Sequence, residues 1–132
     1  MKNLEPKSLW ENFYSLTQIP RPSGKKEEIS AFLANYGRSL GLETIVDEIG
    51  NVIIRKPASA GYENHPGVIL QGHMDMVPQK NSDKVFDFEK DPIEAYVEDN
   101  GEWVTANGTT LGADNGIGVA TAMAILADKN VV

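Results

Sequence analysis

His73 and Asp75 are the side chains in this sequence best placed for chemistry, because they directly follow an apolar run. Residues 68–71 predict a short buried strand that leads into them. Side chains alternate along a strand, so His73 and Asp75 are expected to point to the same side. Ligand sites in α/β sheets lie beyond the carboxyl ends of strands, which is where this pair stands. A metal-bound imidazole usually needs a carboxylate on its other ring nitrogen, and His-x-Asp supplies both groups in one segment.

A second acid, Asp114, stands among small residues where a helix is expected to begin. Gly112 and Gly116 let the backbone approach another group closely, and Gly118 permits tight helix packing. Taken alone, Asp114 could be an ordinary helix N-cap, and His73 could be a hydrogen-bonded core residue. A cap does not require glycine on both sides, so both interpretations of Asp114 stay open at this point.

Two helices are expected before these segments. Pro6 can open the first helix, and the prolines at positions 20 and 22 end it. Ser23 can cap the second helix and Gly41 stops it. The apolar faces predicted to be buried are Leu9, Trp10, Phe13 and Leu16 on the first helix, and Ile29, Phe32, Leu33, Tyr36 and Leu40 on the second.

The rest of the chain predicts strands and one more helix. Two β-hairpins are expected where β-prone runs flank turn residues, namely 43–48 with 52–56 and 93–97 with 103–105. Residues 68–71 are the expected central strand, and a helix over about 115–127 is expected to pack against the sheet. The predicted fold class is therefore α/β: two N-terminal helices, then a mixed, partly parallel sheet with a packed helix.

Composition limits the classes of function and partner. The net charge of −7 argues against nucleic acid as a partner, because binding duplex phosphates needs a basic face. The sequence has no basic amphipathic helix and no run of membrane-spanning length, so we expect no membrane partner. Cysteine is absent, which excludes disulfides, thiolate metal sites and a cysteine nucleophile. Residues 1–20 lack the apolar core of a signal peptide, so a cytoplasmic location is expected.

Five ordered blocks of the sequence resemble the dinuclear zinc peptidases related to aminoacylases and carboxypeptidases. The blocks are residues 19–24 (IPRPSG), 50–56 (GNVIIRK), 72–80 (GHMDMVPQK), 87–92 (DFEKDP) and 111–118 (LGADNGIG). Within that group the chain most resembles the aminoacyl-histidine dipeptidase (Xaa-His dipeptidase) family, and the resemblance runs through nearly its whole length. The residues that follow Asp114 look like the dipeptidase branch rather than the related deacylases.

The resemblance implies a role for each of three side chains. His73 would bind one metal ion, the catalytic-site residue Asp75 would steady His73, and Asp114 would bridge two metal ions. The implied cofactor is a pair of divalent zinc ions, for which cobalt or manganese could substitute. The implied activity is metal-assisted hydrolysis of short peptides with a free N-terminus, such as Xaa-His dipeptides.

The family continues for several hundred residues past the position that matches Val132. The resemblance places there a Glu-Glu pair, whose first member is the family's general base, together with a further carboxylate ligand and a distant histidine. Residues 1–132 are therefore expected to be the incomplete N-terminal portion of the metallopeptidase catalytic domain, inactive alone. The expected partners are a small peptide substrate and the missing C-terminal part of the same enzyme, and a homo-oligomer is also possible.

Two other interpretations remain open. The chain could be a non-catalytic unit that acts by pairing with another chain, because an incomplete sheet exposes an edge. It could also be part of an N-acyl-amino-acid deacylase with the same metal site. Zinc-binding and activity assays test the first interpretation, and the choice between a free dipeptide and an N-acyl amino acid as substrate tests the second.

Overall fold

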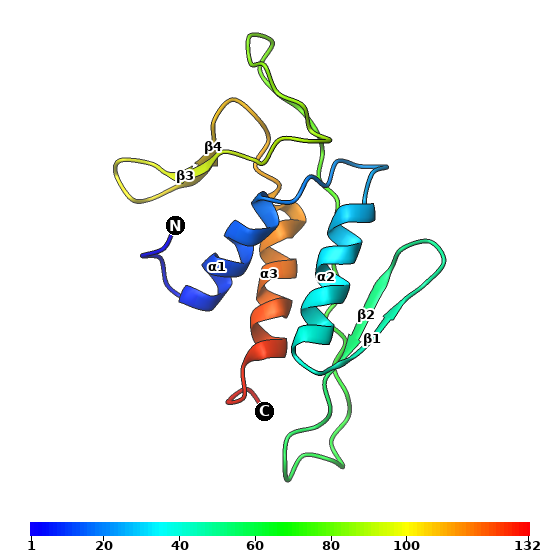
Figure 1. Cartoon of the computed structure of the whole chain (residues 1–132). Helices are drawn as coiled ribbons and strands as arrows, with labels where there is room; N and C mark the ends of the chain where they lie inside the picture. Colours follow the sequence, from blue (N-terminus) through cyan, green and yellow to red (C-terminus); the bar gives the residue numbers. More distant parts are fainter.

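Three helices and two small antiparallel sheets make up the computed structural model, which describes all residues 1–132. In chain order the elements are α1 (Lys7–Thr17), α2 (Glu27–Ser39), β1 (Glu43–Val46), β2 (Val52–Arg55), β3 (Ala95–Val97), β4 (Val104–Ala106) and α3 (Ala113–Ala127). Figure 1 shows the three helices side by side, with the β1–β2 hairpin next to α2 and the β3–β4 hairpin above α1 and α3. The predicted α/β class is confirmed. None of the helices is long and apolar enough to cross a membrane.

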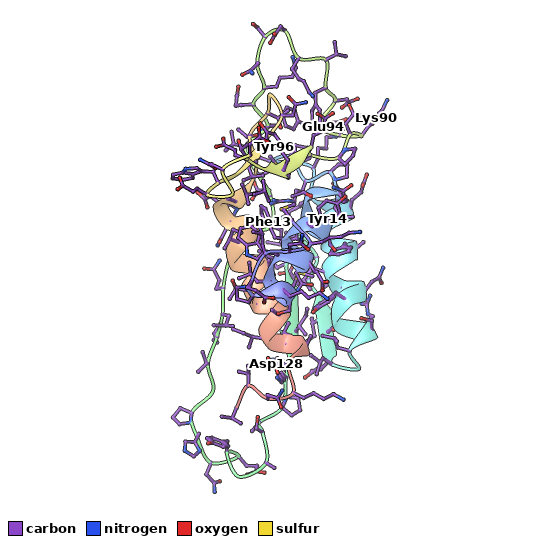
Figure 2. The ribbon with its side chains drawn as sticks, turned by 90° about the vertical axis from the view of Figure 1, so that its left-hand side faces the viewer. Phe13, Tyr14, Lys90, Glu94, Tyr96 and Asp128 are labelled. Atoms are coloured by element: carbon purple, nitrogen blue, oxygen red, sulfur yellow. The ribbon has the colours of Figure 1, made fainter.

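The core lies where the three helices meet. Its buried side chains are Phe13 and Leu16 of α1, Ile29 and Leu33 of α2, and Ala120 and Met123 of α3. Figure 2 shows Phe13 among the helices, and this side chain has no exposed surface. Burying a large apolar side chain stabilises a fold by about 1.5–3 kcal/mol, so these contacts hold the helices together. The apolar faces predicted for the first two helices are the faces that form this core.

Both predicted hairpins are present. β1 pairs antiparallel with β2, and β3 pairs antiparallel with β4. The registers place Thr44 opposite Ile54 and Tyr96 opposite Thr105. In the first turn the Asp47 carboxylate accepts hydrogen bonds from the backbone N–H groups of Ile49 and Asn51, which holds the turn closed.

The predicted central strand over residues 68–71 is wrong, and the expected mixed, partly parallel sheet is not formed. Val68 and Ile69 are 83% and 90% exposed, and residues 61–73 are exposed throughout without helix or paired strand. A strand needs a neighbour to bond its N–H and C=O groups, and the four strands of this structure pair only within their own hairpins. In Figure 2 this part of the chain rises along the left side with no strand beside it.

Two expectations about the later helices are also corrected. Ser23 does not cap α2, whose N-cap is Lys26 without a side-chain hydrogen bond. α3 packs against α1 rather than against a sheet, because no sheet lies where the prediction required one. The backbone of Asp114 and Asn115 is non-helical, so the regular part of α3 begins after Asn115, where the sequence predicted the helix to start.

Candidate metal centre

The His73 imidazole lies between two carboxylates. Its Nε2 is 3.0 Å from Oδ1 of Asp114, and its Nδ1 is 3.1 Å from Oδ1 of Asp75 and 3.0 Å from the Asp75 carbonyl oxygen. The segment that follows residues 68–71 therefore meets the beginning of α3. Asp75 approaches the ring nitrogen that faces away from Asp114, which is the arrangement expected of a carboxylate that orients an imidazole.

The pKa values of this cluster are shifted by its hydrogen bonds. The contact with the Asp114 carboxylate, and then those with Asp75, raise the pKa of His73 above its ordinary value. The pKa of Asp75 is lowered, first by the hydrogen bond from Ser23 and then by His73. Ionised carboxylates only accept hydrogen bonds, so the metal-free site favours an imidazolium with hydrogen on both ring nitrogens. The site can therefore hold a positive charge on His73 between two negative groups.

Asp114 is held open to solvent and does not cap its own helix. Gly112 is the N-cap of α3, with a φ of +79° that favours glycine, and α3 has no side-chain cap. The Asp114 side chain is 96% exposed and its Oδ1 accepts from His73, so the rest of its carboxylate is accessible. The interpretation of Asp114 as an ordinary cap is therefore wrong.

Ser23, which sequence reasoning placed at a helix cap, instead orients Asp75. Its hydroxyl donates to Oδ2 of Asp75 at 2.6 Å, on the carboxylate oxygen that His73 does not use. Backbone bonds join Met76 N–H to the carbonyl of Arg21 at 2.9 Å and Ser23 N–H to the carbonyl of Met76 at 3.1 Å. The IPRPSG block therefore runs alongside the segment that carries His73 and Asp75.

Arg21 is the second residue that sequence reasoning missed. It is 2% exposed, and its guanidinium donates to the carbonyl oxygens of Met74 and Gly112. Burial lowers the pKa of Arg21 from its ordinary value, and the negative charge of Asp75 opposes that shift. The only sequence signal for Arg21 and Ser23 is that both belong to the IPRPSG block. The resemblance includes that block but assigns no role to either of them.

The donor set suits a divalent metal but does not complete a metal site. Imidazole nitrogen and carboxylate oxygen are ordinary ligands of zinc, and the two donor atoms face one another here. No group of three or more His, Cys, Asp or Glu side chains in the chain is arranged to hold a metal ion. A catalytic zinc normally takes three protein ligands, so His73 and Asp114 could supply only part of the shell.

Comparison with known proteins identifies relatives that are dipeptidases. The chain is 52% identical over 132 residues to the cytosol non-specific dipeptidase of Escherichia coli (strain K12), a match that covers 100% of this chain. Its structure matches the crystal structure of aminoacylhistidine dipeptidase from Vibrio alginolyticus with a TM-score of 0.93 and 49% identity over 98% of the chain. The chain is homologous to these dipeptidases. No protein-family model matches the sequence.

The homology extends more weakly to other peptidases and hydrolases. A tripeptidase from Staphylococcus aureus matches 91% of the chain with a TM-score of 0.72 and 25% identity. A putative [LysW]-lysine/[LysW]-ornithine hydrolase of Pyrococcus furiosus is 36% identical over 63 residues, or 48% of the chain. The chain spans only 27% of the Escherichia coli dipeptidase and 26% of the Vibrio alginolyticus chain. It therefore corresponds to a fragment of these relatives.

Proposed function

We propose that this chain is part of a metal-dependent dipeptidase that hydrolyses short peptides such as Xaa-His. The observation that carries the proposal is the position of His73, whose two ring nitrogens contact Asp114 and Asp75 from opposite sides. The homologues are dipeptidases, which supports peptide hydrolysis as the reaction at this site. A histidine held this way is built to present one fixed nitrogen to a ligand, because the other nitrogen is bonded to a carboxylate.

Each residue of the cluster has a separate task in this proposal. His73 Nε2 and the Asp114 carboxylate would hold the metal, with Asp114 as the bridge between two ions. Asp75 accepts the Nδ1 hydrogen and thereby keeps Nε2 free of a proton when a metal is bound. A metal held there would supply Lewis acidity to activate a water molecule and polarise the scissile carbonyl. Zinc is the metal we propose, and cobalt or manganese could replace it.

The remaining catalytic groups would lie outside residues 1–132. Residues 1–132 would form the N-terminal portion of the catalytic domain, and the rest of the parent protein would supply the general base and the other ligands. The partners would be a small peptide and that missing part, with assembly into a homo-oligomer also open. The Escherichia coli relative is named as a cytosol enzyme, which supports a cytoplasmic location for the parent protein.

Activity assays on the gene product that carries this chain test the proposal. We expect zinc-dependent hydrolysis of Xaa-His dipeptides that a chelator abolishes and His73→Ala removes. The 132-residue chain alone should be inactive with added zinc, because it lacks the general base. Hydrolysis of N-acyl amino acids in preference to free dipeptides would instead assign the site to a deacylase. Unchanged activity after His73→Ala would contradict the proposed site altogether.

A second candidate function, pairing with another chain, is favoured by one specific observation. Val68, Ile69 and Leu70 are exposed apolar residues in a segment without a strand partner. Unpaired backbone beside apolar side chains is a template for strand addition. Sedimentation velocity of the 132-residue chain tests this candidate: a stable dimer would support it, and a monomer at high micromolar concentration would contradict it.

A further inference from the structure

Arg21 joins the two segments that carry the candidate metal ligands. Its Nη1 donates to the carbonyl oxygen of Met74 at 3.0 Å, and its Nη2 donates to the carbonyl oxygen of Gly112 at 2.8 Å. Met74 lies between His73 and Asp75, while Gly112 lies two residues before Asp114. One guanidinium therefore spans the backbones of two segments that are far apart in the sequence. Arg21 makes no hydrogen bond to His73 or Asp114.

The glycines around Asp114 make room for this guanidinium. A Cβ atom added at Gly112 would lie 2.6 Å from Nη2 of Arg21, and one added at Gly116 would lie 2.8 Å from the same atom. Both distances are shorter than real side-chain contacts allow, so any larger residue would displace the arginine or the loop. The atom nearest to both glycines is therefore Nη2 of Arg21, with Met76 also close to Gly112 and Phe13 close to Gly116.

Burial of the Arg21 guanidinium carries a free-energy cost. Arg21 is almost completely buried, and its Nε has no hydrogen-bond partner. Burying a charged group with an unpaired N–H costs free energy, and apolar residues often replace such groups without loss of stability. The neighbouring negative charge of Asp75 offsets part of this cost. Filling space alone does not explain an arginine at this position, because an apolar side chain would fill it without this cost.

We propose that Arg21 is a positioning residue that sets the separation of His73 and Asp114 for metal binding. The inference rests on the proposed metallopeptidase function. The N–H donors of the planar guanidinium point in fixed directions, so the group holds two carbonyl oxygens at a fixed spacing. A lysine ammonium at the same place is a flexible point charge and would not fix that spacing. This bridge would therefore set the distance between His73 and Asp114.

Arg21→Lys, made in the gene product that carries this chain, tests the proposal. Tyr36→Phe is the matched control, because Tyr36 also donates to a backbone carbonyl of α3, that of Met123 at 2.8 Å, away from the site. We expect Arg21→Lys to lower zinc affinity by about tenfold to a hundredfold and to change the visible spectrum of the cobalt-loaded protein. Tyr36→Phe should lower unfolding stability while leaving zinc affinity and the cobalt spectrum unchanged.

Crystal structures of the metal-free proteins provide a readout that needs no metal. In Arg21→Lys the 3.0 Å contact of His73 Nε2 with Asp114 Oδ1 should be lost, while Tyr36→Phe should keep it. If wild-type protein binds no zinc but Arg21→Lys still separates these residues, the proposed function fails, while Arg21 still sets the separation of His73 and Asp114. If wild-type protein binds zinc and Arg21→Lys changes neither affinity nor contact, the positioning role is overturned.

Should Arg21→Lys fail to fold, the zinc-loaded wild-type structure decides. The guanidinium must then still bond to the carbonyl oxygens of both Met74 and Gly112. An Arg21 side chain that has left either carbonyl in the metal-loaded protein would overturn the proposal.

Discussion

Nε2 of His73 lies 3.0 Å from Oδ1 of Asp114, although 41 positions separate the two residues in the chain. The pair forms because a segment without regular structure passes the first turn of α3, where Gly112 leaves space for the approach. A carboxylate that meets an imidazole in this way stabilises the imidazolium form when no metal is present. The contact therefore makes predictions that can be checked on the metal-free chain.

Asp114→Asn should lower the pKa of His73 in the metal-free chain. The contact with Asp114 is the largest cause of the raised His73 pKa, and an amide carries no charge to stabilise the imidazolium. NMR titration of the imidazole signals measures the shift. The control is Asp128→Asn, which makes the same charge change at the opposite end of α3. Equal His73 pKa values in wild type and Asp114→Asn would show that the contact is absent in solution.

The same pKa shift sets the direction of the pH dependence of stability. The pKa of His73 is higher in the folded chain, so the folded state binds this proton more tightly than the unfolded state. This stabilisation is fully present below the unfolded pKa and is lost as the pH rises through the folded value. Denaturant unfolding across that range should show the unfolding free energy falling as the pH rises. The fall should be smaller in Asp114→Asn than in wild type.

Ser23→Ala should raise the pKa of Asp75 towards its ordinary value and destabilise the fold. The Ser23 hydroxyl is the largest cause of the lowered Asp75 pKa, and losing one hydrogen bond to a partly exposed carboxylate costs about 1 kcal/mol. The stabilisation is present above the unfolded Asp75 pKa and is lost as the pH falls. Carboxyl NMR shifts and urea unfolding measure both effects. Ser39→Ala, which removes a hydroxyl bonded to the Tyr36 carbonyl, should leave the Asp75 pKa unchanged.

Local patterns predicted local structure well. Helical faces such as the one carrying Phe13 and Leu16 follow from spacing along one element, and the hairpin turns follow from their own turn residues. The placement of Asp75 beside His73 also needed only the alternation of an extended segment. Each of these features is decided by residues close together in the chain.

Features that depend on distant partners could not be predicted in this way. The segment at 68–71 has the composition of a central strand, but a strand exists only where other strands bond to it. Ser23 has the right type for a helix cap, yet its hydroxyl bonds to Asp75, 52 positions away. Arg21 contacts Met74 and Gly112 at separations of 53 and 91 positions. No spacing rule within the IPRPSG block points to these partners.

Hydrogen exchange should show that residues 68–70 are unprotected in the isolated chain. Their amides lie in an exposed segment outside every helix and strand, so they should exchange near the rate of an unfolded peptide. Amides of the buried part of α2, such as that of Leu33, serve as the internal reference and should be protected. In the proposed parent protein, where further strands would pair with this segment, we expect the 68–70 amides to be protected as well. Protection already present in the isolated chain would instead support pairing between chains.

Gly116→Ala should destabilise the chain, against the usual effect of this substitution. Inside a helix alanine is normally more stable than glycine by roughly 0.5–1 kcal/mol, and Gly116 begins the regular part of α3. At position 116, however, the added methyl group would lie 2.8 Å from Nη2 of Arg21 and 3.0 Å from Cε2 of Phe13. Overpacking of this kind typically costs about 1–3 kcal/mol, so the net change in unfolding free energy should be a loss of up to about 2 kcal/mol.

Gly67→Ala is the control for that substitution, because its added Cβ would meet nothing within 4 Å. Its unfolding free energy should match that of wild type within about 0.5 kcal/mol, as expected for a surface substitution. Urea unfolding followed by circular dichroism measures all three proteins. A Gly116→Ala chain at least as stable as wild type would mean that the space beside α3 is free. The guanidinium of Arg21 would then not lie against Gly116 in solution.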